Sequence, residues 1–326
     1  MKILITGTAG FVGFHVAKRL LCEGQQVFGV DNFNDYYSPR LKYARHAILE
    51  RSPNYSWKNL DIGDADALRQ VFMDFCPDVV INLAAQPGVR YSLLHPEVYL
   101  HSNLAGFLNV LECCRHARKM PRLLFASSSS VYGGNRDLPY RESQKVDNPV
   151  SLYAATKKSN ELMAHCYSHL FGFQTIGFRF FTVYGPWGRP DMAYFSFAEK
   201  LVSGQSIKVF NYGDMYRDFT YVDDIVDGIV RCVYAENLPK YEIYNIGNSR
   251  SEKLTTMIEI LAQALGVADP KLDLQPMQPG DVYQTYADVS KLNDAVGYSP
   301  TTPLSVGLPK FVAWFREWKA DQETTA

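Results

Sequence analysis

The chain has 326 residues, 47% of them hydrophobic, so it can bury a large core, and we expect one larger domain and a smaller second one. Its 33 Lys and Arg residues nearly balance its 34 Asp and Glu residues, which gives no electrostatic basis for binding nucleic acid or an anionic membrane surface. No apolar run approaches the roughly 20 residues of a membrane span, and a chain that begins at once with a strand pattern leaves no room for a cleaved signal, so we expect a cytoplasmic location.

The first predicted element is a short apolar strand at residues 2–6. It breaks directly into a helical pattern that starts at Phe11 and Val12 and runs to Gly24, with Gly7, Gly10 and Gly13 at the junction. The first glycine permits a tight turn, the second leaves room for a diphosphate against the backbone, and the third lets helix and strand pack closely. Because helix N–H groups attract anions, this stretch predicts a dinucleotide site.

A second predicted strand, residues 26–31, ends in Asp31. An acidic side chain at that strand end can accept hydrogen bonds from the adenosine ribose hydroxyls and repel a 2′-phosphate. The pattern therefore favours NAD over NADP.

Strand-like and helical patterns then alternate as far as about residue 180. Strands are predicted near residues 2–6, 26–31, 55–60, 78–83, 121–127 and 173–180, and helices near residues 11–24, 65–75, 103–117 and 152–171. This alternation predicts an α/β fold with a doubly wound parallel (Rossmann) sheet, whose ligands bind at the carboxyl ends of the strands. Three stretches that follow strands are the candidates: Asp61-Ile62, Leu83-Ala84-Ala85-Gln86 and Ser127–Ser130.

After about residue 183 the pattern becomes less regular, with prolines and glycines close together and short strands and helices mixed. We expect a cofactor-binding domain at residues 1–182 and a smaller mixed α/β substrate domain at residues 183–326. A helical pattern and a strand pattern within residues 222–247 are expected to return to the sheet.

The cysteines and histidines give no metal signature. Six cysteines are scattered without a Cys-x-x-Cys pair, and we expect reduced thiols. His165 and His169 lie one helical turn apart, but no acidic base follows the first and no third ligand is evident. No metal site is predicted.

The strongest chemical pattern is Tyr153 and Lys157, preceded by a run of four serines that includes Ser128. Residues four apart share one face of a helix, so the phenol and the ammonium can reach the same cleft. A nearby ammonium and a positive nicotinamide ring both favour the phenolate, which could then take a proton from a substrate hydroxyl.

With the glycine turn included, the chain resembles the extended short-chain dehydrogenase/reductase family from end to end. Ser128, Tyr153 and Lys157 match that family's catalytic residues. The resemblance implies an NAD site made by Gly7, Gly10, Phe11, Val12, Gly13, Asp31, Asn32, Asp61, Ile62, Leu83, Ala84, Ala85, Gln86, Asn103, Tyr153 and Lys157.

Within that family the chain is most similar to the nucleotide-sugar epimerases, and among them to the UDP-glucuronate 4-epimerases. The similarity rests on the segments at residues 84–92, 103–112, 182–193 and 277–282. It implies that a UDP-sugar is bound by Arg90, Ser129, Ser130, Thr182, Arg189, Asn211, Arg217 and Asp281. The chain departs from the common pattern at Pro87, where Ala is usual, at Ser128, where several members have Thr, and at Gln278, where galactose-type members often have Arg.

This similarity implies NAD-dependent interconversion of UDP-glucuronate and UDP-galacturonate through a 4-keto sugar, in a homodimer formed by the helices near 103–117 and 152–171. A UDP-glucuronate decarboxylase or a UDP-glucose 4-epimerase would use most of the same residues. A dehydratase is disfavoured because related dehydratases have Asp-Glu where Ser129 and Ser130 stand. A non-catalytic NAD-binding scaffold would have lost the catalytic Tyr or Lys, and both are present.

Overall fold

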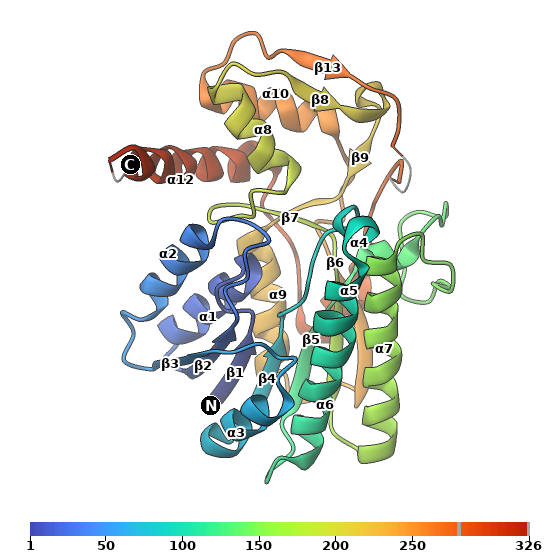
Figure 1. The fold of residues 1–326 in the computed structure, drawn as a ribbon. Helices are drawn as coiled ribbons and strands as arrows, with labels where there is room; N and C mark the ends of the chain where they lie inside the picture. Colours follow the sequence, from blue (N-terminus) through green and yellow to red (C-terminus); the bar gives the residue numbers. More distant parts are fainter. Residues whose placement is uncertain (279–281, 325–326) are drawn as a thin grey trace.

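The structure, a computed structural model, describes residues 1–278 and 282–324. Its largest element is a seven-stranded parallel sheet in the order β11-β6-β5-β4-β1-β2-β3 (Figure 1). The strands are β1 Lys2–Thr6, β2 Gln26–Asp31, β3 Tyr55–Asn59, β4 Val79–Asn82, β5 Arg122–Ser128, β6 Thr175–Phe180 and β11 Tyr241–Ile246. The predicted doubly wound parallel fold is confirmed, and the strand order reverses between β1 and β4.

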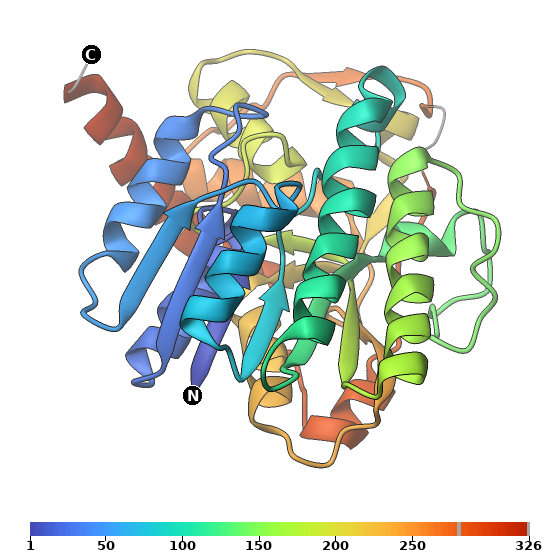
Figure 2. The same cartoon turned by 60° about the horizontal axis from the view of Figure 1, so that its bottom comes forward.

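Helices cover both faces of this sheet (Figures 1 and 2). One face carries α1 Phe11–Cys22, α2 Pro39–Leu49, α9 Val222–Tyr234 and α11 Ser290–Val296, and the other carries α3 Ala65–Phe75, α6 Gly106–His116 and α7 Leu152–Phe171. Alternation along β1 shows why both faces need a cover, since Ile3 and Ile5 join one apolar cluster while Leu4 joins the other.

Short helices connect these elements. They are α4 Tyr91–Leu94, α5 Pro96–Tyr99, the π-helix η1 Leu100–Ala105 and the 3₁₀-helices η2 Ser129–Tyr132 and η3 Phe210–Gly213. The helix predicted near residues 103–117 thus begins in a π-helical turn and becomes α-helical only at Gly106.

The C-terminal region lies beyond the carboxyl ends of the sheet strands, at the top of Figure 1. Its elements are α8 Ala193–Val202, α10 Leu254–Leu265, α12 Leu304–Thr324, β7 Thr182–Tyr184, β8 Ile207–Val209, β9 Tyr216–Arg217, β10 Phe219–Tyr221, β12 Glu252–Lys253 and β13 Leu272–Leu274. The short strands pair as β7 with β10, β8 with β13 and β9 with β12. No helix among residues 1–278 and 282–324 is long and apolar enough to cross a membrane.

A buried ion pair fixes α7 to the sheet beneath the site. The Arg179 Nε and Nη2 atoms donate to the Glu161 carboxylate at 2.8 and 2.9 Å, and both side chains are at most 3% exposed. Ser127 Oγ donates to the same carboxylate at 2.7 Å. Because Glu161 lies one turn after Lys157 on α7, and Ser127 precedes Ser128 on β5, this pair fixes the spacing between the two elements that carry the predicted catalytic residues.

Removing one charge of this pair should destabilise the fold strongly. For Glu161→Gln we expect a loss of about 3–5 kcal/mol in the free energy of unfolding, because Arg179 would stay buried without a counter-charge. Asp227→Asn, at the partly exposed Arg231–Asp227 pair on α9, is the control and should cost less than about 1 kcal/mol. Urea unfolding of both variants is the measurement, and equal losses would contradict a special role for the buried pair.

Candidate active site

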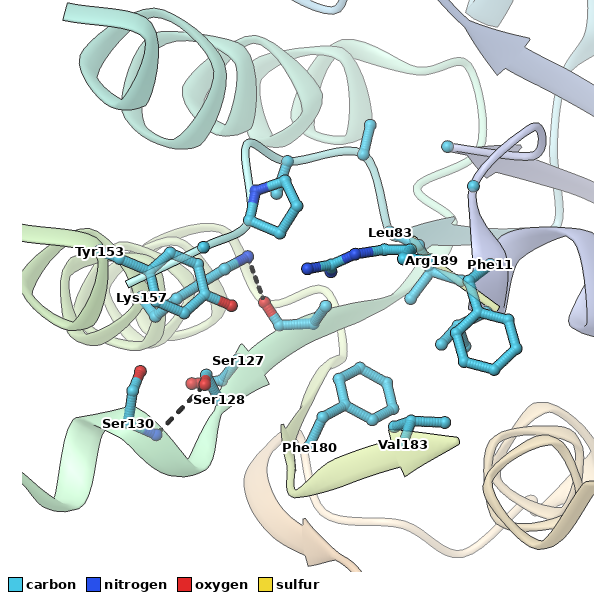
Figure 3. A pocket seen from close by; sticks show the side chains of 18 of the residues that line it. Phe11, Leu83, Ser127, Ser128, Ser130, Tyr153, Lys157, Phe180, Val183 and Arg189 are labelled. Carbon is cyan, nitrogen blue, oxygen red and sulfur yellow. Dashed lines mark hydrogen bonds between the residues drawn. The ribbon is translucent and has the colours of Figure 1, made fainter. Parts of the chain in front are cut away.

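A cavity of about 470 Å³ lies at the carboxyl ends of the sheet strands, between the sheet and the C-terminal region. Its wall comes from the turn after β1, the loops after β2, β3, β4, β5 and β6, and the start of α7, with Arg217 and Thr285 on the C-terminal side. Figure 3 shows side chains from these segments converging on one space. The reversal of strand order between β1 and β4 makes this the expected place for a ligand.

The glycine turn packs so tightly that side chains are excluded. Gly7 has φ +79°, and a Cβ there would lie 2.7 Å from the Ala84 backbone nitrogen. A Cβ on Gly13 would lie 2.0 Å from the Gly7 carbonyl oxygen. Gly10 caps α1, and the helix begins at Phe11 and Val12, all of which line the cavity. The first turn of α1 therefore borders the cavity beside three residues that have no side chain, Gly7, Gly10 and Gly13, and this arrangement fits the diphosphate of a dinucleotide.

The acidic residues after β2 and β3 are fixed by hydrogen bonds. Asp31 accepts from the backbone N–H groups of Ala9 at 3.0 Å and Phe33 at 2.9 Å. Asn32 donates to Asp61 at 2.8 Å, and Asp61, like Ile62, lines the cavity. Each carboxylate oxygen has further acceptor capacity for ribose hydroxyls or an adenine amino group.

The loop after β4 divides the predicted cofactor residues into two groups. Leu83, Ala84 and Ala85 line the cavity, whereas Gln86 and Asn103 are buried and do not. The Gln86 N–H donates to Asn103 Oδ1 at 2.7 Å, and Asn103 Nδ2 donates to the Gln86 carbonyl and to Thr156 Oγ1 on α7, each at 3.1 Å. These two residues hold the loop against α7 from behind the cavity wall, and Asn103 does so from a π-helical turn, a feature often found at functional sites.

The three predicted catalytic residues meet in one corner of the cavity (Figure 3). Ser128 ends β5, and its hydroxyl accepts from the Ser130 N–H at 3.2 Å. Tyr153 lies in the first turn of α7, where Ser151 Oγ caps the helix by accepting from the Ala154 N–H at 3.1 Å. Lys157, one turn further, is buried and donates to the Ala126 carbonyl at 3.0 Å, with its Nζ 6.0 Å from the centre of the Tyr153 ring.

The environment shifts both titratable groups. Burial raises the pKa of Tyr153, while a hydrogen bond with Ser128 and the charge of Arg189 act in the opposite direction. Burial lowers the pKa of Lys157 to about 8. A cationic group near the phenol, such as a nicotinamide ring, would act against burial, lower the pKa of Tyr153 and bring it nearer to the range of a general base.

The predicted substrate residues fall into three groups. Ser129, Ser130, Thr182, Arg189 and Arg217 line the cavity. Arg90 and Asn211 do not: the Arg90 guanidinium lies 5.1 Å from the centre of the Phe210 ring, and Asn211 Nδ2 donates to the Asp214 carbonyl at 2.6 Å. Asp281 lies outside the described residues. Ser130 Oγ is buried and has no hydrogen-bond partner within the described part of the chain, so it can donate to a ligand.

Several cavity residues were not predicted from the sequence. The loop between β2 and α2 contributes Asn34, Tyr36 and Tyr37, and α2 contributes Lys42, which donates to the Asn34 carbonyl at 2.6 Å. Burial lowers the pKa of Lys42 to about 8, although the charge of Asp31 acts against this shift. The sequence signal was a run of polar and aromatic residues directly after Asp31, which loops commonly contain.

We compared the chain with protein families, with known protein sequences and with solved structures. The model of the NAD-dependent epimerase/dehydratase family matches residues 3–247. "Protein CapI" of Staphylococcus aureus is 48% identical, covering 98% of this chain and 99% of its own length, and "UDP-glucuronate 4-epimerase 4" of Arabidopsis thaliana is 45% identical, covering 100% and 78%. The crystal structure of a UDP-glucuronic acid 4-epimerase from Bacillus cereus, in complex with UDP-glucuronic acid and NAD, superposes with a TM-score of 0.92 at 33% identity, covering 98% of this chain and all of the other.

Proposed function

The chain belongs to the NAD-dependent epimerase/dehydratase family, and from this membership we propose that it is an isomerase that interconverts UDP-glucuronate and UDP-galacturonate at C4. One observation carries the choice of an acidic sugar. The guanidinium of Arg189 enters the cavity that also holds Ser128, Tyr153 and Lys157 (Figure 3). A guanidinium there suits a carboxylate on the reacting sugar.

The proposed chemistry begins with proton transfer. Tyr153 takes the proton of the C4 hydroxyl while the C4 hydrogen leaves with its electron pair, and Ser128 shares the hydrogen bond. The glycine turn of Gly7–Gly13 and the carboxylate of Asp31 would hold NAD, which would supply a reversible hydride acceptor for C4. Between the two transfers the 4-keto sugar turns over, so the hydride returns to the opposite face and Tyr153 gives its proton back. No net oxidation occurs.

Substrate binding is assigned to the remaining cavity residues. Arg217 lies on the C-terminal side, where a guanidinium can pair with the UDP diphosphate. Ser129, Ser130 and Thr182 supply hydroxyls beside the proposed catalytic serine. Ser130 Oγ has no hydrogen-bond partner among the described residues, which supports a contact with the sugar carboxylate. These donors can hold the carboxylate close to the ring plane, which matters because a ketone at C4 is beta to it.

One assay tests the proposal. The purified protein is incubated with UDP-glucuronate, and the nucleotide sugars are separated. UDP-galacturonate without added NAD is the expected product, because bound cofactor is regenerated in each turnover. UDP-pentose as the main product would indicate a decarboxylase instead, and a preference for UDP-glucose would indicate a neutral-sugar epimerase. If no substrate is converted, the remaining interpretation is a non-catalytic NAD-binding scaffold.

We also expect a homodimer. Leu100, Leu108, Leu162 and Leu170, which lie on η1, α6 and α7, are 39–69% exposed. The two α-helices pack side by side (Figures 1 and 2), so these leucines can form one apolar surface that a second copy would cover. Light scattering at micromolar concentration should give twice the mass of one chain, and a monomer mass would contradict the prediction.

A further inference from the structure

The Arg189 guanidinium is held by an acidic partner two residues later in the chain. Its Nε donates to Asp191 Oδ1 at 2.9 Å and its Nη2 to Asp191 Oδ2 at 2.6 Å. The two side chains are only 22% and 27% exposed, so water competes weakly for this pair. The bond uses one edge of the guanidinium. Its Nη1 makes no hydrogen bond to any residue in the described ranges 1–278 and 282–324.

Asp191 is itself fixed from the cofactor side of the cavity. The Tyr36 hydroxyl, in the loop after β2, donates to Asp191 Oδ2 at 3.2 Å. The Tyr36 ring meets Tyr91 edge-on at 4.8 Å, and its hydroxyl lies where a Cβ on Gly88 would come within 2.7 Å. Burial alone would raise the pKa of Asp191, but the charge and hydrogen bonds of Arg189 and the Tyr36 hydroxyl bring it below the ordinary value, so Asp191 is ionised at neutral pH.

The backbone before Arg189 is fixed from the same side. Arg45 of α2 is fully buried and donates to the carbonyls of Trp187 at 2.7 and 3.0 Å, Gly188 at 3.0 Å and Ala9 at 2.8 Å. Ala9 belongs to the glycine turn, so the loop that carries Arg189 is joined to the proposed dinucleotide site. Backbone and side chain of Arg189 are therefore both held in one arrangement.

We propose that Asp191 is a positioning residue, oriented by Tyr36, that sets the plane of the Arg189 guanidinium so that its free edge meets the substrate carboxylate in the one geometry that prevents decarboxylation. The inference rests on the proposed function, because it concerns the hexuronate bound to Arg189. A guanidinium fork gives directional hydrogen bonds only when its plane is fixed. Asp191 also balances the charge of Arg189, so the sugar is held mainly by direction rather than by net charge.

The expected consequence of this positioning is epimerisation without loss of carbon dioxide. In the 4-keto sugar, loss of carbon dioxide requires the C5–C6 bond to align with the carbonyl π system, so that its electron pair passes into an enolate at C4 while a proton is later taken up at C5. A carboxylate held near the ring plane keeps that bond out of alignment. If the guanidinium were free to rotate, the carboxylate could leave the ring plane and the C5–C6 bond could align with the carbonyl π system.

Asp191→Asn is the test, assayed with UDP-glucuronate as the probe. We expect the ratio of UDP-pentose to UDP-galacturonate to rise at least about tenfold and epimerisation kcat to fall by up to about 10²-fold, as for a misplaced reacting group. KM and the co-purified NAD should change little. Tyr36→Phe, which removes one hydroxyl, should shift the product ratio in the same direction but less, and Asp191→Glu should restore part of it. Asp227→Asn, at the Arg231 pair outside the site, should leave the ratio unchanged.

An unchanged product ratio in both Asp191→Asn and Tyr36→Phe would overturn this role of Asp191 while leaving the proposed function in place. A wild-type protein that does not epimerise UDP-glucuronate would instead overturn the proposed function, and this role with it. A product ratio that shifts only in step with a lower melting temperature, and equally in Asp227→Asn, would also overturn the role, because it would mean a general loss of stability.

Discussion

Replacing Tyr153 by phenylalanine should lower epimerase turnover by about 10²–10⁴-fold, the effect of removing a general base. Tyr153 and Ser128 both line the cavity, and Ser128 opposes the rise that burial causes in the pKa of the Tyr153 phenol, whereas Lys157 donates to the Ala126 carbonyl. We therefore expect the Lys157 ammonium to supply positive charge beside the phenol, and the Tyr153 phenol is the group that remains to accept a proton. Turnover is measured by separating UDP-glucuronate from UDP-galacturonate at saturating substrate.

Two controls separate chemistry from folding. Bound NAD, released by denaturation and quantified by absorbance, should be unchanged in Tyr153→Phe, because the proposed cofactor contacts of the glycine turn and Asp31 remain. Tyr167→Phe removes a phenol on the same helix, where the hydroxyl contacts Glu112 away from the cavity, and it should keep full turnover. Near-normal turnover in Tyr153→Phe would remove Tyr153 from the proposed mechanism.

The sequence predicted the sheet well because its physical signal is local. Strands covered on both faces are continuous apolar runs, and β1 and β2 have the predicted bounds. The prediction of the helix near Asn103 was less accurate, because the chain forms a π-helical turn there and becomes α-helical only at Gly106. Side-chain periodicity does not distinguish one π-helical turn from an α-helix, and the bonds from Asn103 to Gln86 and Thr156 that accompany this turn join segments far apart in the chain.

Residues that line the cavity could be predicted where a motif is contiguous, and they were missed where their position depends on packing. The glycine turn and the spacing of Tyr153 and Lys157 can be read from neighbouring residues. The contribution of Tyr36 could not be, because its hydroxyl reaches Asp191, which is 155 positions away. The same limit applies to Arg189, because its loop is held at the cavity by hydrogen bonds from Arg45 on α2, which lies far away in the sequence.

Arg189→Ala should weaken UDP-glucuronate binding far more than NAD binding. Charge-assisted hydrogen bonds contribute about 1.5–3 kcal/mol, which corresponds to a loss of roughly 10–10²-fold in affinity for the sugar nucleotide. Titration calorimetry with UDP-glucuronate measures this loss, and the co-purified NAD content serves as the internal control. Arg189→Lys keeps the charge without the fork, so it should lie between the wild type and Arg189→Ala.

The same variant should also change the product. Without the guanidinium, only the hydroxyls of Ser129, Ser130 and Thr182 remain to restrain the carboxylate in the oxidised intermediate, and these rotate more freely than a paired arginine. Carbon dioxide should then be lost from part of the 4-keto sugar, and UDP-pentose should accompany the remaining UDP-galacturonate. Unchanged affinity for UDP-glucuronate together with unchanged epimerisation would refute the carboxylate contact. A wild-type preference for UDP-glucose would refute the hexuronate assignment itself, because a neutral sugar gives Arg189 no carboxylate to bind.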